Sequence, residues 1–112
     1  MTDNMNKIIL PLLMAFSTIV NAQIVVTEFN AEWNAANKVD WLEKLSDCDV
    51  AQVDITKEVK LQQEHKVVIV PTIIVFKDGE EIKRYQADLS FKMLATRKEI
   101  QEFINEQIMS DF

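Results

Sequence analysis

The spacing of apolar positions changes several times along this chain, and each change indicates a new secondary-structure element. Ile24 to Phe29 is rich in β-branched residues between polar positions, which predicts a buried strand. From about Ala35 to Asp47, apolar residues recur every three or four positions, as on one face of a helix. Asp49 to Thr56 alternates apolar and polar side chains and predicts a second strand. Thr56 is expected to cap a short helix that runs to about His65.

The next apolar run continues from Val67 to Phe76 and is interrupted by Pro71. Because proline has no N–H for a strand ladder, Pro71 is expected to mark where a loop enters the strand, with both peptide isomers open. Lys77 to Glu80 contains the only glycine and predicts a hairpin turn, and Glu81 to Ala87 returns as an antiparallel strand.

A closing helix follows, with Thr96 and Glu99 spaced as a capping box at its start. One face of this helix is apolar and consists of Ile100, Phe103, Ile104 and Ile108. The predicted element order is therefore β-α-β-α-β-β-α.

The N-terminus has the layout of a secretory signal peptide. Lys7 precedes a nearly unbroken apolar run from Ile8 to Val20, and small or apolar residues stand before an expected cleavage after Ala22. We therefore expect a signal peptide over residues 1–22 and one exported domain over residues 23–112, periplasmic or extracellular. After cleavage, no apolar stretch remains that would insert stably into a membrane. The alternative is an ordinary first helix of a cytosolic domain.

The length and the net charge of the chain limit the number of domains and the classes of function that it can have. A chain of 112 residues supports one hydrophobic core, and a single glycine with two prolines leaves no flexible linker. The formal charge of −6 argues against nucleic-acid binding and against docking on anionic lipid.

Three motifs in order resemble the thioredoxin family. Glu28 to Lys38 (EFNAEWNAANK) is similar to the family's strand and redox loop, Val70-Pro71-Thr72 to its cis-proline loop, and Ile73 to Glu80 (IIVFKDGE) to its following strand and turn. The resemblance implies an α/β fold, a three-layer α/β/α sandwich around a mixed four-stranded sheet. The resemblance covers Ile24 to about Ile108, and the family's additional first strand and helix are expected to be missing.

The redox loop departs from the family at its two reactive positions. Asn34 and Asn37 stand where the resemblance places the cysteines, so the degenerate loop cannot hold a dithiol or a disulfide. Disulfide exchange needs an attacking thiolate and a leaving sulfur, and an amide supplies neither. We therefore lean against an enzyme. The loop comprises Trp33, Asn34, Ala35, Ala36, Asn37 and Lys38.

The family's buried acid and its neighbouring lysine correspond to Glu28 and Gln52. A buried carboxyl beside an amide lacks a compensating cation, which should raise its pKa. A structural hydrogen bond between these two side chains is the favoured interpretation.

Cys48 is the only thiol. It fits a small buried hydrophobe, and Asp47 and Asp49 would raise its pKa. The alternative is a monothiol oxidoreductase that uses Cys48. His65 has no neighbours at metal-ligand spacing, so no metal and no cofactor are expected.

The resemblance also implies a binding surface for a protein or an extended peptide. It would consist of Trp33 and the Val70-Pro71-Thr72 loop, with Val70 offering backbone groups to a strand-like peptide. The alternative is that these residues serve folding alone. A further possibility is a structural subunit of an envelope complex, docked through a patch of Phe91 and Met93. The apolar residues Leu89, Phe91 and Met93 either cover the core or make a partner contact.

Overall fold

The computed structural model describes residues 23–110. The predicted signal peptide, residues 1–22, lies outside this part of the chain. The elements in order are the strand β1 (Ile24–Asn30), the 3-10 helices η2 (Glu32–Asn37) and η3 (Leu42–Lys44), β2 (Asp49–Asp54), α2 (Val59–Glu64), β3 (Thr72–Lys77), β4 (Glu80–Gln86) and α3 (Arg97–Met109).

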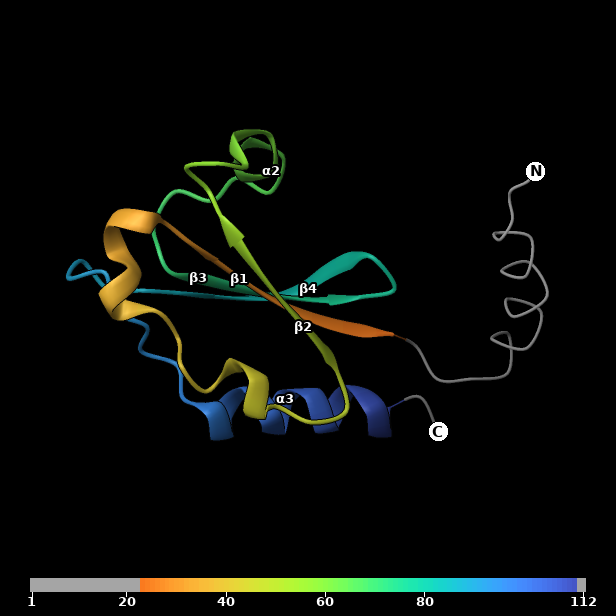
Figure 1. Ribbon diagram of the computed structural model, residues 1–112. Coiled ribbons are helices and arrows are strands. Elements are labelled where there is room, and N and C mark those ends of the chain that lie inside the picture. The colour runs from red at the N-terminus through yellow and green to blue at the C-terminus, as the bar shows by residue number, and fades with distance from the viewer. Residues whose placement is uncertain (1–22, 111–112) are drawn as a thin grey trace, which may run out of the picture.

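The four strands form one mixed sheet in the order β2-β1-β3-β4. β1 and β2 are parallel, with Val25 opposite Asp49 and Asn30 opposite Asp54. β3 is antiparallel to both β1 and β4. Figure 1 shows α2 on one face of this sheet and α3 on the other. The predicted three-layer α/β/α arrangement around a mixed four-stranded sheet is therefore confirmed.

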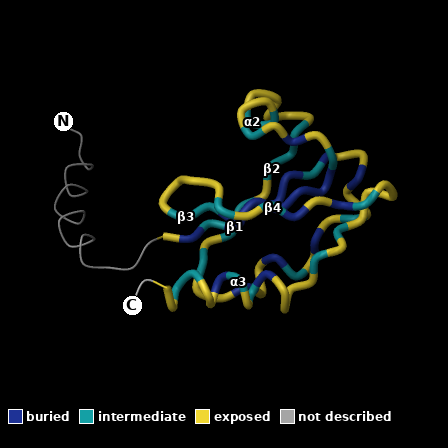
Figure 2. The backbone as a smooth tube through the Cα atoms, turned by 180° about the vertical axis from the view of Figure 1, so that it is seen from behind, coloured by how far each residue is buried: buried dark blue, intermediate teal, exposed yellow. Residues whose placement is uncertain are grey.

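Apolar side chains fill both layers between sheet and helices. The larger cluster lies between the sheet and α3, where Ile100 and Ile104 are fully buried. The smaller cluster lies on the α2 face, around Phe29 and Ile74. Figure 2 shows the buried stretches gathered along the sheet, whereas α2 and the loops are mostly exposed.

The helix predicted from Ala35 to Asp47 is wrong. Two short 3-10 helices, η2 and η3, occupy this segment, and they are separated by an extended break. The backbone N–H of Val39 donates to the Glu28 carboxylate at 2.9 Å, although in an α-helix it would donate to the Ala35 carbonyl. The periodicity correctly identified Val39, Leu42 and Leu45 as buried, whereas Ala35 is exposed. A tertiary hydrogen bond decided the backbone path.

The cap predicted for the second helix is also wrong. The Thr56 hydroxyl and backbone N–H both donate to Asp54, which closes a tight turn at the end of β2. α2 begins later, after Glu58, without a side-chain cap. At the last helix the Thr96 hydroxyl accepts the Glu99 N–H at 3.1 Å, so that predicted start is confirmed.

The hairpin between β3 and β4 has the predicted two-residue turn. Asp78 and Gly79 both have positive φ, at 53° and 87°, as a type I′ turn requires. An added Cβ at Gly79 would meet nothing within 4 Å, so only the backbone conformation opposes a side chain there.

Gly79→Ala should therefore lower the free energy of unfolding by about 1 kcal/mol, the cost of placing alanine in the left-handed region. Urea denaturation of both proteins measures this difference. Gly79→Asn is the matched control, because asparagine tolerates positive φ, and it should lose less stability than alanine. Equal stability of Gly79→Ala and the parent would contradict the assignment of the turn.

Candidate functional site: an asparagine loop at the end of β1

Three asparagines meet where β1 passes into η2. Asn34 is 5% exposed, and its Nδ2 donates to Asn30 Oδ1 at 3.0 Å. Asn37 Nδ2 donates in turn to Asn34 Oδ1 at 2.9 Å. The two positions at which the resemblance places cysteines are thus adjacent, but they are joined by an amide hydrogen bond.

The second hydrogen of the Asn34 amide reaches a distant segment. It donates to the Phe91 carbonyl at 3.2 Å, which ties η2 to the 88–92 loop, residues 88–92 between β4 and α3. Within this loop the Asp88 carboxylate accepts the N–H groups of Ser90 and Lys92. These bonds hold the loop in a fixed turn against the site.

The 88–92 loop places an aromatic ring beside Trp33. The rings of Trp33 and Phe91 meet edge to face with centroids 5.3 Å apart. Trp33 is 64% exposed and Phe91 39% exposed, and Leu89 in the same loop as Phe91 is 91% exposed. We call Trp33 and Phe91 the aromatic pair. Such a pair offers apolar area that protein partners commonly use.

The proline loop predicted to share this surface is largely covered. The peptide bond between Val70 and Pro71 is cis. Val70 is 3% exposed and Thr72 is 0% exposed, and the Thr72 hydroxyl donates to the Ile69 carbonyl. The Pro71 carbonyl accepts the Ala87 N–H at 3.0 Å. A molecule at this surface would therefore contact the aromatic pair more than the proline loop.

We call the segment that carries Asn30, Asn34 and Asn37 the asparagine loop. Glu28 lies behind this loop and is only 1% exposed. Gln52 Nε2 donates to its Oε1 at 3.2 Å, as the sequence predicted, and the Val39 N–H donates to its Oε2. Burial raises the pKa of the Glu28 carboxyl, and the hydrogen bonds from Val39 and Gln52 and the charge of Lys38 oppose part of this rise.

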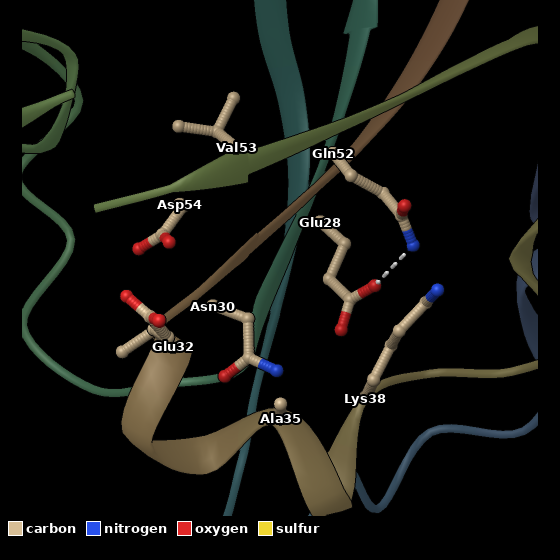
Figure 3. A pocket seen from close by; sticks show the side chains of 9 residues that line it. Glu28, Asn30, Glu32, Ala35, Lys38, Gln52, Val53 and Asp54 are labelled. Carbon is tan, nitrogen blue, oxygen red and sulfur yellow. Dashed lines mark hydrogen bonds between the residues drawn. The ribbon is translucent and has the colours of Figure 1, made fainter. Parts of the chain in front are cut away.

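A cavity of about 310 Å³ opens beside Glu28, between η2 and the ends of β1 and β2. Figure 3 shows the carboxylates of Glu32 and Asp54 on one side of it and the Glu28–Gln52 pair with Lys38 on the other. The cavity therefore carries three carboxyl groups and one ammonium group.

Cys48 lies at the other end of the sheet. It precedes Asp49, which pairs with Val25 near the start of β1, whereas Pro71 precedes Thr72, which pairs with Phe29 near its end. Val25 and Phe29 are four residue steps apart on β1, about 13 Å along the strand. Cys48 is half-buried and packs against the larger core cluster.

The Cys48 thiol is expected to react slowly. Burial, and then the charges of Asp49 and Asp47, raise its pKa, so less thiolate is present at neutral pH. Iodoacetamide at pH 7.5 should alkylate the folded protein about tenfold more slowly than the urea-unfolded chain. Asp47→Asn should speed the folded reaction, and Asp40→Asn, away from the thiol, is the matched control. Equal rates for folded and unfolded protein would contradict the expectation.

His65 packs between aromatic rings. Its ring lies 5.6 Å from that of Phe29 and 5.3 Å from that of Phe76, measured between centroids. Within residues 23–110, no group of three His, Cys, Asp or Glu side chains is placed to hold a metal ion. No helix in the same part of the chain is long and apolar enough to cross a membrane.

The structure thus brings Trp33, Asn34 and Asn37 together with residues that sequence reasoning did not assign to this site. Asn30 could have been found, because the spacing of Asn30, Asn34 and Asn37 is that of neighbours on a helical turn. Phe91 was selected only as part of a docking patch, and its contact with Asn34 could not have been predicted, because it spans 57 residues of sequence. Glu32 and Asp54 at the cavity carried no sequence signal.

Comparisons with solved structures show the same fold. A thioredoxin mutant from Halobacterium salinarum is 23% identical, with a TM-score of 0.63, and the alignment covers 77% of this chain and 75% of that one. Fasciola hepatica thioredoxin is 25% identical, with a TM-score of 0.56 and coverage of 85% and 90%. Thioredoxin NaTrxh from Nicotiana alata is 22% identical, with a TM-score of 0.59 and coverage of 88% and 84%.

The comparison with curated proteins gave no match. The family model for thioredoxin matches residues 10–106, which is most of the chain. Together with the sheet order and the loop that follows β1, this match shows that the chain belongs to the thioredoxin family.

Proposed function

We propose that this is an exported thioredoxin-family protein without dithiol redox activity, which binds a protein or an extended peptide through the aromatic pair. The observation that carries the proposal is the Asn34 amide. Asn34 stands where the resemblance places a cysteine, and its side chain is buried. Its Nδ2 donates one hydrogen to Asn30 and the other to the Phe91 carbonyl. The side chain at this position therefore holds the 88–92 loop in place instead of carrying a reactive sulfur.

The hydrogen bonds that hold the 88–92 loop also favour binding, because they order the surface in advance. A surface that is already ordered loses less conformational entropy when a partner docks. The aromatic pair is ordered by the edge-to-face contact and by the hydrogen bonds of the 88–92 loop. Since Val70 is nearly covered, the partner would rest on Trp33, Phe91 and the exposed Leu89.

Export is proposed from the sequence alone. The apolar run from Ile8 to Val20 and the small residues before Gln23 support a cleaved signal peptide. N-terminal sequencing of the protein from its native cells should begin at Gln23. A mature protein that retains Met1 or Met5 would contradict export by this route.

The redox half of the proposal is tested by insulin reduction with dithiothreitol. The protein should give the rate of a no-protein control, because an amide neither attacks a disulfide nor leaves as a thiolate. Turnover clearly above the control would overturn it. If turnover occurred and vanished in Cys48→Ser, the monothiol alternative would take its place. The raised pKa and half-buried position of Cys48 weigh against that alternative.

The binding half is tested by selecting ligands from a random peptide library displayed on phage. Trp33→Ala and Phe91→Ala should each weaken the selected peptides about tenfold or more, as expected of aromatic residues at an interface centre. Met109→Ala is the matched control, because Met109 is also exposed, at 72%, and lies at the end of α3. Peptides that bind all four proteins equally would exclude the aromatic pair as the binding surface.

A further inference from the structure

Phe91 holds a backbone conformation that is unusual for its residue type. Its φ is 65°, in the left-handed region, where the Cβ of a non-glycine residue crowds the backbone. The Phe91 N–H donates to the Asp88 carbonyl at 3.0 Å, and the Asp88 N–H donates to the Lys92 carbonyl at 3.1 Å. This is the hydrogen-bond pattern of a turn followed by a left-handed residue, a position that favours glycine. The 88–92 loop therefore carries backbone strain at Phe91.

Two contacts oppose this strain. Asn34 Nδ2 donates to the Phe91 carbonyl at 3.2 Å, and the rings of Phe91 and Trp33 meet edge to face with centroids 5.3 Å apart. One hydrogen bond and one aromatic contact stabilise the loop by an amount similar to the cost of a left-handed phenylalanine. The observed closed position of the loop is therefore close in free energy to an open position, in which Phe91 leaves the left-handed region.

The Asn34 amide is placed to decide between these two positions. Its Oδ1 accepts from Asn37 and one of its hydrogens goes to Asn30, so the orientation of the amide is fixed. The other hydrogen goes to Phe91. Within the part of the chain that the structure describes, this is the one hydrogen bond between η2 and the 88–92 loop, which lie next to each other in Figure 1. Removing this donor should therefore favour the open loop.

The residue type at position 91 points to a role for the ring. Glycine would hold the closed backbone without strain, but it would offer no ring to Trp33. Strain that persists in a structure is commonly found where it serves a function. Phenylalanine at this position costs stability in the turn and contributes an aromatic surface in return.

We propose that the 88–92 loop is a conformational switch, with Phe91 as its hinge and Asn34 as the residue that positions it. The aromatic pair exists only in the closed position. The consequence rests on the proposed function: a partner that docks on both rings binds only the closed loop, so its apparent affinity follows the closed fraction. Partner binding in turn shifts the loop toward the closed position.

The first test follows the loop without a partner. Trp33 is labelled as 5-fluorotryptophan in a Trp41→Phe background, because the chain has two tryptophans. The fluorine NMR shift reports the nearby Phe91 ring, and Phe91→Ala gives the reference shift without it. Asn34→Ala should lower the ratio of closed to open loop about fivefold and move the shift toward this reference. Asn37→Ala is the matched control, because it leaves the donation from Asn34 to Phe91 in place, and it should keep the parent shift.

Asn34→Asp is the second variant at this position, in case Asn34→Ala does not fold. It keeps the shape of the side chain and the oxygen that accepts from Asn37. At neutral pH its carboxylate cannot donate to the Phe91 carbonyl, so it should move the fluorine shift in the same direction as Asn34→Ala.

The second test measures the strain at Phe91. Phe91→Gly and Phe91→Ala both lack the ring, so the difference in their urea denaturation isolates the backbone. The glycine variant should be the more stable, by about fivefold in the unfolding equilibrium constant, because glycine adopts positive φ freely. Lys92 is the matched control, since it is exposed and its φ is not positive. At that position the order should reverse, with Lys92→Gly less stable than Lys92→Ala.

A parent-like fluorine shift in the Asn34 variants would overturn the proposal, because the loop would then stay closed without its donor. A Phe91→Gly protein less stable than Phe91→Ala would also overturn it, because the turn would then carry no strain. Neither test uses a partner, so both differ from a failure of the phage test, which would remove the aromatic pair as the binding surface. Peptides selected on the aromatic pair should bind Asn34→Ala up to about fivefold more weakly. Unchanged binding would contradict the coupling between the switch and the partner.

Discussion

The double variant Asn34→Cys/Asn37→Cys is expected to form an internal disulfide and to gain insulin-reducing activity. Asn34 and Asn37 are three residues apart in η2 and their side chains are hydrogen-bonded to each other, so cysteines at these positions would lie on the same side of the loop. Activity should exceed that of either single variant by about tenfold, because exchange needs both an attacking and a resolving sulfur.

The gain has a structural cost. Asn34 loses its hydrogen bonds to Asn30 and Phe91, which should lower the free energy of unfolding by about 1–3 kcal/mol. Mass spectrometry after mild oxidation detects the disulfide, and urea denaturation measures the stability. Asn34→Cys alone and Asn37→Cys alone are the controls. A double variant that stays fully reduced would show that the loop has lost the geometry for this chemistry as well as the sulfur.

Glu28→Ala is expected to destabilise the protein by about 2–4 kcal/mol. It leaves the buried Val39 N–H without its acceptor, deprives Gln52 of a partner, and removes the side chain that sets the chain path between η2 and η3. Glu102→Ala, an exposed change on α3, should stay within about 0.5 kcal/mol of the parent. Urea denaturation of both variants is the test, and equal effects would contradict the structural role of Glu28.

Glu28→Gln tests the charge separately. Because the pKa of the Glu28 carboxyl is raised in the folded state, the folded protein holds more protons than the unfolded chain at pH values between the two pKa values. The contribution of Glu28 to stability is therefore full below about pH 4.5 and decreases as pH rises through the folded pKa.

The stability of the parent relative to Glu28→Gln should accordingly fall between pH 4 and pH 7.5. Asp54, Glu81 and Asp88 have lowered pKa values and act in the opposite direction, but they are present in both proteins and cancel in the difference. A difference that is constant with pH would mean that Glu28 does not titrate in this range.

Features that depend on neighbouring residues could be predicted from the sequence. The hairpin at Asp78-Gly79 follows from residues that accept positive φ, and the start of α3 follows from the Thr96 hydroxyl. Alternating apolar residues predicted β2 and β4, whereas β1 and β3 were predicted from runs of apolar and β-branched residues, because these two strands are mostly buried on both faces. The Glu28–Gln52 bond was predicted only through the family resemblance.

The wrong helix prediction and the missed loop contact both depend on residues that are distant in sequence. The helix expected from Ala35 onward does not form, because the Val39 N–H donates to Glu28, a side chain on another element. The 88–92 loop was brought to Asn34 by a bond over 57 residues, which no local pattern encodes.

By itself, the sequence determined the strands, the closing helix and the absence of a second thiol, since these depend on neighbours in the chain and on composition. The tertiary structure alone decided that the asparagine loop is fastened to the 88–92 loop and that Val70 is covered. It also decided that a cavity lies beside Glu28, between η2 and the ends of β1 and β2. These features arise where segments distant in sequence meet, so the free energy of their contacts is set only after the chain has folded.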